Sequence, residues 1–302
     1  MRRFRSLVRS ALIEALAEPL SAVLFLVALL TIPLLPVLHC HQFGEAGRLP
    51  RECGFSALLV FGVLFATSSA VRVIGGELAS GTASAALARD VSRPLFFCAK
   101  VVGVLAAFAL FCVAVGFSTL TSVAVAEMGQ VEQQMGGLPV WLQGLVVTVV
   151  LTLVGFSTAG ILNRFCRTRF CVTACLAIST AQIPALAWVA WKSTVPLHLG
   201  LIPALGVLAV GCCVFIVLAG ALAVRLPPAA VTTGVALAVL SSFIWPVRAI
   251  LPDIEKFWLV DSFSYGGAPT VEQLLSALAA GTLLVVLWLA VGSILLERRE
   301  VS

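Results

Sequence analysis

The sequence predicts an all-α, polytopic membrane protein. Of its 302 residues, 61% are hydrophobic and only 11% are charged, whereas a soluble domain carries roughly one quarter charged residues. The mean hydropathy is +1.11. Since a helix needs about 20 apolar residues to cross a bilayer, the chain has room for about eight spans with short connections and for no soluble domain.

The apolar stretches divide into eight predicted spans, each separated from the next by a polar or proline-containing segment. A short interfacial helix is expected at 254–260, before the last span. The predicted spans are approximately 20–38, 55–74, 95–126, 140–162, 170–190, two within 199–250 that are divided at 225–228, and 271–296.

The start of the chain forms an amphipathic helix. Apolar side chains recur at three- and four-residue intervals from Phe4 to Leu16, and four arginines lie elsewhere around the helix. Pro19 is expected to end it. We therefore divide the chain into an interfacial helix at 1–19, lying on the anionic cytoplasmic leaflet, and a transmembrane permease domain at 20–302. The alternative is that the helix continues directly into the first span.

The basic residues predict the orientation. Most of the 19 Lys and Arg residues fall on the side that carries both termini. Only Arg48, Arg51, Lys192, Arg248 and Lys256 fall on the other side. Short loops rich in Lys and Arg stay in the cytoplasm, so both termini are predicted to be cytoplasmic.

The longest polar interruption on the basic side runs from Arg72 to Lys100. Gly75-Gly76 and Gly81 are expected to break the chain there, while 83–88 is good helix-forming sequence. The pattern predicts a short cytoplasmic helix held between two membrane spans.

This interruption carries a likeness to a known family. Its residues are Glu77-x-x-x-Gly81-Thr82, then Arg89-x-Val91-Ser92-Arg93-x-x-Phe96-Phe97-x-x-Lys100. They resemble the loop between the second and third spans of ABC-2 type permeases, the membrane subunits of ABC transporters. Asp90 and Ala99 depart from that pattern, where Pro and Gly are usual. A second likeness is Leu251-Pro252-Asp253-Ile254-x-x-Phe257-Trp258-x-x-Asp261.

The resemblance implies a coupling helix between Glu77 and Arg93 that rests on a separate ATPase subunit. It also implies a dimer with a second copy or a paralogous permease subunit, export as the direction of transport, and a bacterial inner membrane. Many ABC-2 type permeases have six spans, two fewer than predicted here. The candidate ATPase-coupling residues are Glu77, Gly81, Thr82, Arg89, Asp90, Ser92 and Arg93.

Several chemistries are missing from the sequence. No Asp, Glu, Lys or His is predicted at the midpoint of a span, which argues against a proton relay. No Gly-x-x-x-x-Gly-Lys-Ser/Thr segment occurs, so ATP is not bound by that route. We therefore expect that the chain is not an enzyme and that it takes its energy from an ATPase partner. No nucleic-acid binding is expected either, since the basic residues are accounted for by the orientation in the membrane. The interior polar groups are mainly Ser and Thr, which suits an amphipathic or lipid-like substrate.

Two other functions stay open. A self-energised secondary transporter would need a titratable group inside the spans, at a position other than those predicted here. A membrane scaffold or intramembrane enzyme would need polar side chains that converge in one cavity.

The cysteines suggest one covalent link. Cys40 and Cys53 share one extracytoplasmic loop, where an oxidising compartment permits a disulfide. The alternative is a copper or zinc site of His39, Cys40 and His41 with Cys53. We favour the disulfide because this spacing matches no established metal motif. No metal or other cofactor is predicted.

Overall fold

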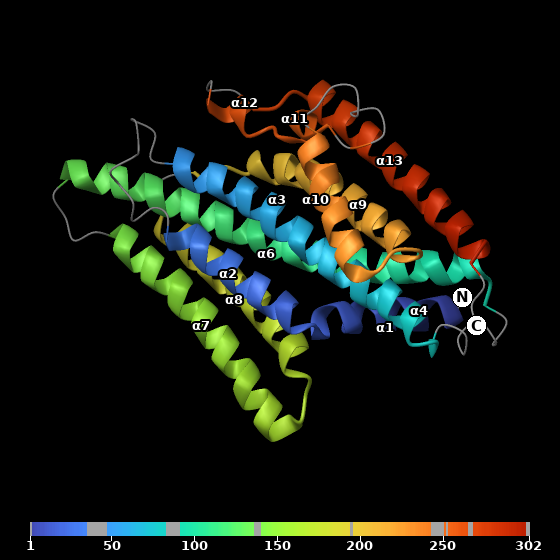
Figure 1. Cartoon of the computed structure of the whole chain (residues 1–302). Coiled ribbons are helices and arrows are strands. Elements are labelled where there is room, and N and C mark those ends of the chain that lie inside the picture. The colour runs from blue at the N-terminus through green and yellow to red at the C-terminus, as the bar shows by residue number, and fades with distance from the viewer. Residues whose placement is uncertain are drawn as a thin grey trace.

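The computed structural model is all-α, as the sequence predicts (Figure 1). It describes residues 2–34, 47–82, 91–135, 140–193, 196–242, 251, 253–264 and 268–299, and no β-strand occurs within them. The elements are α1 (Arg2–Ala17), α2 (Pro19–Leu34), α3 (Arg48–Ala70), the π-helix η3 (Val71–Gly76), α4 (Glu77–Ala79), α6 (Arg93–Met135), α7 (Val140–Cys166), α8 (Phe170–Lys192), α9 (Leu201–Ala223), α10 (Pro228–Ser241), α11 (Ile254–Phe257), α12 (Asp261–Ser264) and α13 (Val271–Glu297).

The chain is a multi-pass membrane protein. Within the described residues, six helices are long and apolar enough to cross a membrane: the continuous α3–η3–α4 helix, α6, α7, α8, α9 and α13. A seventh candidate is the bent pair of α1 and α2, which meet at 65°. α10 is apolar but has 14 residues, fewer than the roughly 20 that a bilayer requires. The structure therefore has six or seven candidate spans and a short apolar helix where the sequence predicts eight spans.

The first predicted element is confirmed as a separate helix. α1 ends at Ala17, the chain bends at Glu18, and α2 starts at Pro19. The arginines of α1 at positions 3, 5 and 9 are exposed, while Ala11 and Ala15 are buried. A Cβ on Gly103 of α6 would overlap the Ala11 Cβ, so the apolar face of α1 packs directly on α6.

The predicted break at Gly75-Gly76 is wrong. The helix of α3 continues through these glycines as the π-helix η3 and then through α4, up to Ala79. Ile74 and Leu78 are buried in an apolar cluster with Phe97, and this packing outweighs the weak helix propensity of glycine. The predicted break at Gly81 is confirmed: α4 ends at Ala79, and Gly81 has a φ of 71°, a conformation that favours glycine.

Between the predicted spans at 95–126 and 140–162 the sequence also predicts a loop at 127–137, and this prediction is wrong over most of its length. α6 continues to Met135. Glu127 does not need to face water, because its Oε1 lies 2.8 Å from His198 Nε2. Met128 packs in a small apolar cluster with Val125 and Val189 of α8, which holds this part of α6 in place.

The helices run between two ends of a bundle, with α6 in contact with α1, α2, α3, α7, α8, α9 and α13 (Figure 1). We call the end that holds both labelled termini the basic end. It comprises α1, η3–α4, the first turns of α6, the turn between α9 and α10, and the last turn of α13. The opposite end holds α11, α12 and the end of α6.

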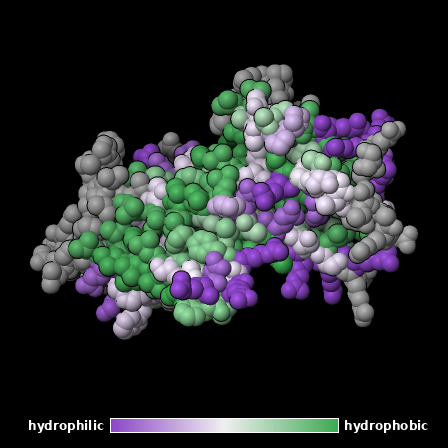
Figure 2. Space-filling model, turned by 60° about the horizontal axis from the view of Figure 1, so that its bottom comes forward, coloured by the Kyte–Doolittle hydropathy of each residue, from purple (hydrophilic) through white to green (hydrophobic). Residues whose placement is uncertain are grey.

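The surface of the bundle is suited to lipid. Large apolar side chains are exposed along α7 and α13, among them Leu153, Leu283 and Val286. Figure 2 shows hydrophobic residues over a broad area of one face and hydrophilic residues gathered on the right-hand side, where the basic end lies. This separation is what a membrane and its aqueous border require.

Glycines let aromatic rings sit against helix backbones inside the bundle. A Cβ on Gly292 of α13 would overlap the Phe97 ring of α6. The Phe257 ring of α11 rests on two glycines, Gly211 of α9 and Gly281 of α13, where an added Cβ would lie 2.9 and 3.1 Å from the ring. Of the helix expected at 254–260, only its first turn is helical, as α11, which is anchored between α9 and α13; α12 follows the expected range.

We predict that Gly103→Ala destabilises the protein. An ordinary Gly-to-Ala change within a helix stabilises it by roughly 0.5–1 kcal/mol. At Gly103 the new methyl group would overlap Ala11 Cβ and would lie 2.7 Å from the Val8 carbonyl oxygen, and overpacking of this kind costs about 1–3 kcal/mol. Thermal unfolding in detergent gives the sign, and hydrogen–deuterium exchange of α1 shows whether α1 has separated from α6.

Gly206→Ala in α9 is the matched control, because its Cβ would meet nothing within 4 Å. Gly206→Ala should leave the melting temperature unchanged or raise it. Equal effects of the two substitutions would contradict the close α1–α6 contact.

Candidate functional site

The residues marked by the sequence resemblance lie at the basic end, at the end of α4 and the start of α6. Glu77 begins α4. Thr82 is exposed, and its Oγ1 donates to the Glu77 carbonyl oxygen at 3.3 Å beyond the turn at Gly81. Ser92 is exposed next to Arg93, where α6 begins. Arg89 and Asp90, with the predicted helical segment 83–88, lie outside the described residues.

A buried cation ties the first of these residues to the bundle. Lys100 of α6 is 1% exposed, and its Nζ donates a hydrogen bond to Glu77 Oε1 at 2.5 Å. Glu14 of α1 contributes a second carboxylate, with Oε2 at 3.6 Å from the same nitrogen. The Lys100 Nζ also lies 5.8 Å from the centre of the Phe96 ring. Three elements, α1, α4 and α6, therefore meet at one ammonium group.

The burial of Lys100 determines how strongly it depends on its two carboxylate partners. The two carboxylate side chains retain some access to water, with exposed fractions of 22% for Glu77 and 31% for Glu14. A buried ammonium is stable only with close anionic partners. The Glu77 carboxylate is therefore occupied within the chain, and it fixes the end of α4 relative to α6.

Arginine side chains at the basic end bond the end of α13 to its neighbours. Arg93 at the start of α6 donates to the carbonyl oxygens of Glu297 at 2.7 Å and Arg299 at 2.9 Å. Arg299 donates to the carbonyl oxygen of Val224, after α9, and Arg225 donates weakly to Leu295 at 3.5 Å. These carbonyl groups belong to helix ends, where intrahelical donors are lacking. The end of α13 is thus bonded to both α6 and α9.

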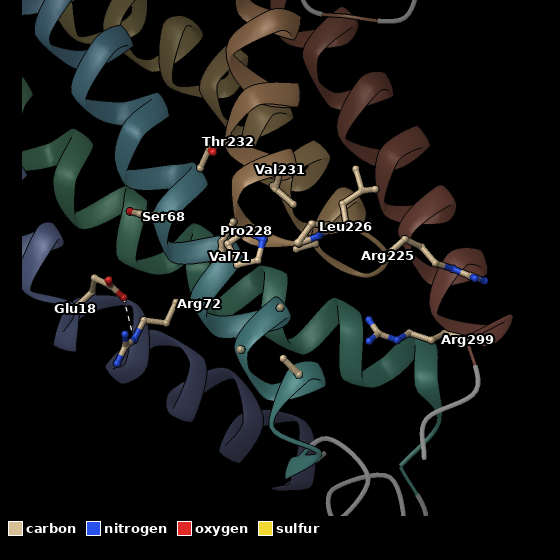
Figure 3. A pocket seen from close by; sticks show the side chains of 15 residues that line it. Glu18, Ser68, Val71, Arg72, Arg225, Leu226, Pro228, Val231, Thr232 and Arg299 are labelled. Atoms are coloured by element: carbon tan, nitrogen blue, oxygen red, sulfur yellow. Dashed lines mark ion pairs between the residues drawn. The ribbon is translucent and has the colours of Figure 1, made fainter.

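A cavity of about 740 Å³ opens beside these contacts, between η3 and the first turn of α10 (Figure 3). Arginines from three segments line it, together with the carboxylate of Glu18. Figure 3 shows Arg299 extending from the end of α13 toward η3, and Arg72 turned toward Glu18. The Arg72 Nε lies 2.9 Å from Glu18 Oε2. The arginines that line the cavity are Arg72, Arg225 and Arg299.

The opposite end offers no comparable cluster of basic side chains among the described residues. His198, before α9, pairs with Glu127. No group of three or more His, Cys, Asp or Glu side chains in the described part of the chain could hold a metal ion. His39, Cys40 and His41 lie outside that part. Cys53 is half-buried in α3 and is bonded to no described cysteine, so the predicted Cys40–Cys53 disulfide stays a prediction.

No protein-family model, curated protein or solved structure matches the chain. The membrane assignment consequently rests on the length, hydropathy and exposure of the helices.

The buried cation was not predicted from the sequence. The hydropathy pattern placed Lys100 at the edge of a cytoplasmic loop, whereas this residue lies two turns inside α6. The N-terminal helix contained a signal, since Glu14 stands beside Ala11 and Ala15 on the face that the structure buries. A carboxylate on a face that becomes buried needs a cationic or hydrogen-bonding partner.

We predict that Lys100→Met lowers the free energy of unfolding by about 3 kcal/mol. The loss arises because two carboxylates remain without their cation, and their partial exposure places it at the low end of the range for a broken buried pair. Chemical denaturation in detergent micelles measures the change. Replacing all three groups, with Glu14→Gln and Glu77→Gln added, should recover most of the stability.

Lys192→Met provides the control, since Lys192 is exposed at the end of α8 and its replacement should be nearly neutral. A Lys100→Met protein as stable as the Lys192→Met protein would show that the three-residue cluster contributes no stability.

Proposed function

We propose that the chain is the membrane-spanning permease subunit of an ABC-2 type transporter in a bacterial inner membrane. In this proposal both termini and the basic end face the cytoplasm, and a separate ATPase subunit binds there. A second copy of the chain or a paralogous permease completes the membrane part. The substrate is an amphipathic or lipid-like molecule, and the direction is export.

One observation carries the proposal: the segment between α4 and α6 is anchored on both sides. On its N-terminal side Glu77 is bonded to Lys100, and through Lys100 to α1. On its C-terminal side Arg93 is bonded to the end of α13. A force applied at Glu77 or Arg93 would therefore be passed to α1, α3, α6 and α13, which is how a soluble motor can drive a membrane domain.

The lining of the bundle supports the substrate class. The buried polar side chains within the helices are mostly hydroxyls bonded to the carbonyl oxygen of the preceding turn, as for Thr119, Thr148 and Thr152. Gln182 of α8 bonds to Thr152 at 3.0 Å. Such groups offer weak polarity and no fixed charge, which suits an amphiphile better than a small ion.

The Lys100 cluster supports a second candidate, a transporter driven by an ion gradient. A buried lysine flanked by two partly exposed carboxylates is the type of group that relays protons in such proteins. Its simultaneous contacts with Glu77 of α4 and Glu14 of α1 favour a structural role, because they join three elements at one buried group.

The decisive test is to purify the protein from its native membrane in mild detergent and to identify what accompanies it. We expect a stoichiometric soluble ATPase, whose recovery falls at least about ten-fold in Arg89→Ala/Asp90→Ala. The paired removal of charges leaves the net charge unchanged and deletes two predicted contacts with the ATPase. Quantitative mass spectrometry of the purified material measures the ratio of the two proteins.

Glu255→Ala/Lys256→Ala is the matched control, because it removes an adjacent pair of opposite charges from α11 at the opposite end. Its ATPase recovery should equal that of the unmodified protein. Recovery of the chain alone, with uptake in vesicles that follows a proton or sodium gradient without ATP and is lost in Lys100→Met, would replace the proposal by the second candidate.

A further inference from the structure

The cavity at the basic end is lined on one side by glycine and alanine residues of a π-helical turn and the helix that follows it. This side is formed by η3 and the end of α4, which contribute Gly75, Gly76 and Ala79 to the lining. A Cβ on Gly76 would meet nothing within 4 Å. The π-helical turn from Val71 to Gly76 widens the helix at this place, and such turns are frequent at functional sites. Small side chains on a widened turn leave room for a ligand.

The walls of the cavity are strongly basic. Three arginines and one glutamate line it, which leaves two positive charges in excess. Arg72, Arg225 and Arg299 each use one nitrogen for the contact described above. Since a guanidinium carries five N–H donors, donors remain for a ligand. α10 also begins here, with Pro228 in the lining, and the positive end of its dipole adds to the field. The chemistry favours an anion with several acceptor oxygens.

Two stripes of exposed apolar residues start at this cavity and run along the surfaces of α3 and α10. On α3, Leu64 and Val60 follow Ser68 at four-residue intervals, and both are exposed. On α10, Ala236 and Leu240 follow Thr232 at the same interval and are also exposed. Because Ser68 and Thr232 both line the cavity, each stripe begins at it. If an anionic group bound in the cavity carried hydrocarbon chains, these chains could pack against the two apolar stripes.

We propose that this cavity binds the headgroup of an anionic phospholipid, with its phosphate bound by the arginines that line the cavity and its acyl chains along the stripes of α3 and α10. Guanidinium groups match the geometry of phosphate oxygens. Basic pockets between membrane helices are established places for anionic lipid headgroups. The apolar stripes select a lipid over a free phosphate. Lipid binding of this kind holds whether or not an ATPase drives the protein.

Lipid binding can be measured on the purified full chain by native mass spectrometry. The probes are phosphatidylglycerol, which is anionic, phosphatidylcholine, which carries the same phosphodiester without net charge, and glycerol 3-phosphate, which lacks acyl chains. The unmodified protein should retain phosphatidylglycerol in preference to phosphatidylcholine and should retain no glycerol 3-phosphate at the same concentration.

Two kinds of variant locate the binding site. Gly76→Leu puts a branched apolar side chain into the cavity while it keeps every arginine, and it should weaken the preference for phosphatidylglycerol. Arg299→Gln should weaken binding about five-fold, as expected for the loss of one basic residue near a membrane surface. Arg72→Gln, on a different element, should have a similar effect and serves if Arg299→Gln unfolds the end of α13.

Each control variant makes the same kind of substitution at a position outside the cavity. Arg298→Gln removes an exposed charge next to Arg299 that does not line the cavity. Gly206→Leu adds the same side chain as Gly76→Leu at an open position on α9. Both should bind phosphatidylglycerol like the unmodified protein. The inference is overturned if Gly76→Leu keeps the lipid preference, if Arg298→Gln and Arg299→Gln act alike, or if glycerol 3-phosphate binds as well as the lipid.

Discussion

The contact between Lys100 and its two carboxylates sets the geometry of the basic end. A buried ammonium cannot be left without anionic partners, so Glu14 and Glu77 must be brought to it from two other elements. α1 is thereby held on α6, and α4 is held at the end of α3. The bend at Glu18 follows, because α1 must lie on α6 while α2 continues into the bundle. One side chain near the start of α6 thus determines how three segments approach one another.

The rest of the bundle depends on small residues. Apolar helices gain little from the hydrophobic effect when they leave lipid for one another, so close van der Waals packing has to supply their association. Glycine provides it here by admitting a ring against a helix, as at Gly292 with Phe97 and at Gly281 with Phe257. These contacts place α13 against α6 and α11, although most of α13 remains exposed to lipid.

Hydropathy made part of the fold predictable, and tertiary packing decided the rest. The membrane class, the separate N-terminal helix and the approximate places of the spans were evident, because each follows from runs of apolar residues or from a proline such as Pro19. The continuation of the helix through Gly75-Gly76 was not evident, because it depends on partners of Ile74 and Leu78 that lie far along the chain. The loop predicted at 127–137 was wrong for the same reason, since the partner of Glu127, His198, is 71 residues away.

The candidate site was predictable in position and not in detail. The polar motif located Glu77 and Arg93 at the basic end, where the structure has them. It could not indicate that both side chains are engaged inside the chain, with Lys100 and with the end of α13. The arginines around the cavity come from three segments, of which the first and the last, at Arg72 and Arg299, are 227 residues apart in the sequence, and no local pattern joins them.

The π-helix between α3 and α4 changes the direction in which the side chains after it point around the helix axis. A wide turn accommodates one residue more than an α-helical turn, and one residue corresponds to about 100° around a helix. The stretch after η3 is therefore rotated relative to the stretch before it. α3 can direct its apolar face toward α9 while Glu77, just beyond the wide turn, is directed toward Lys100. The wide turn thus lets a single continuous helix present different faces to two different neighbours.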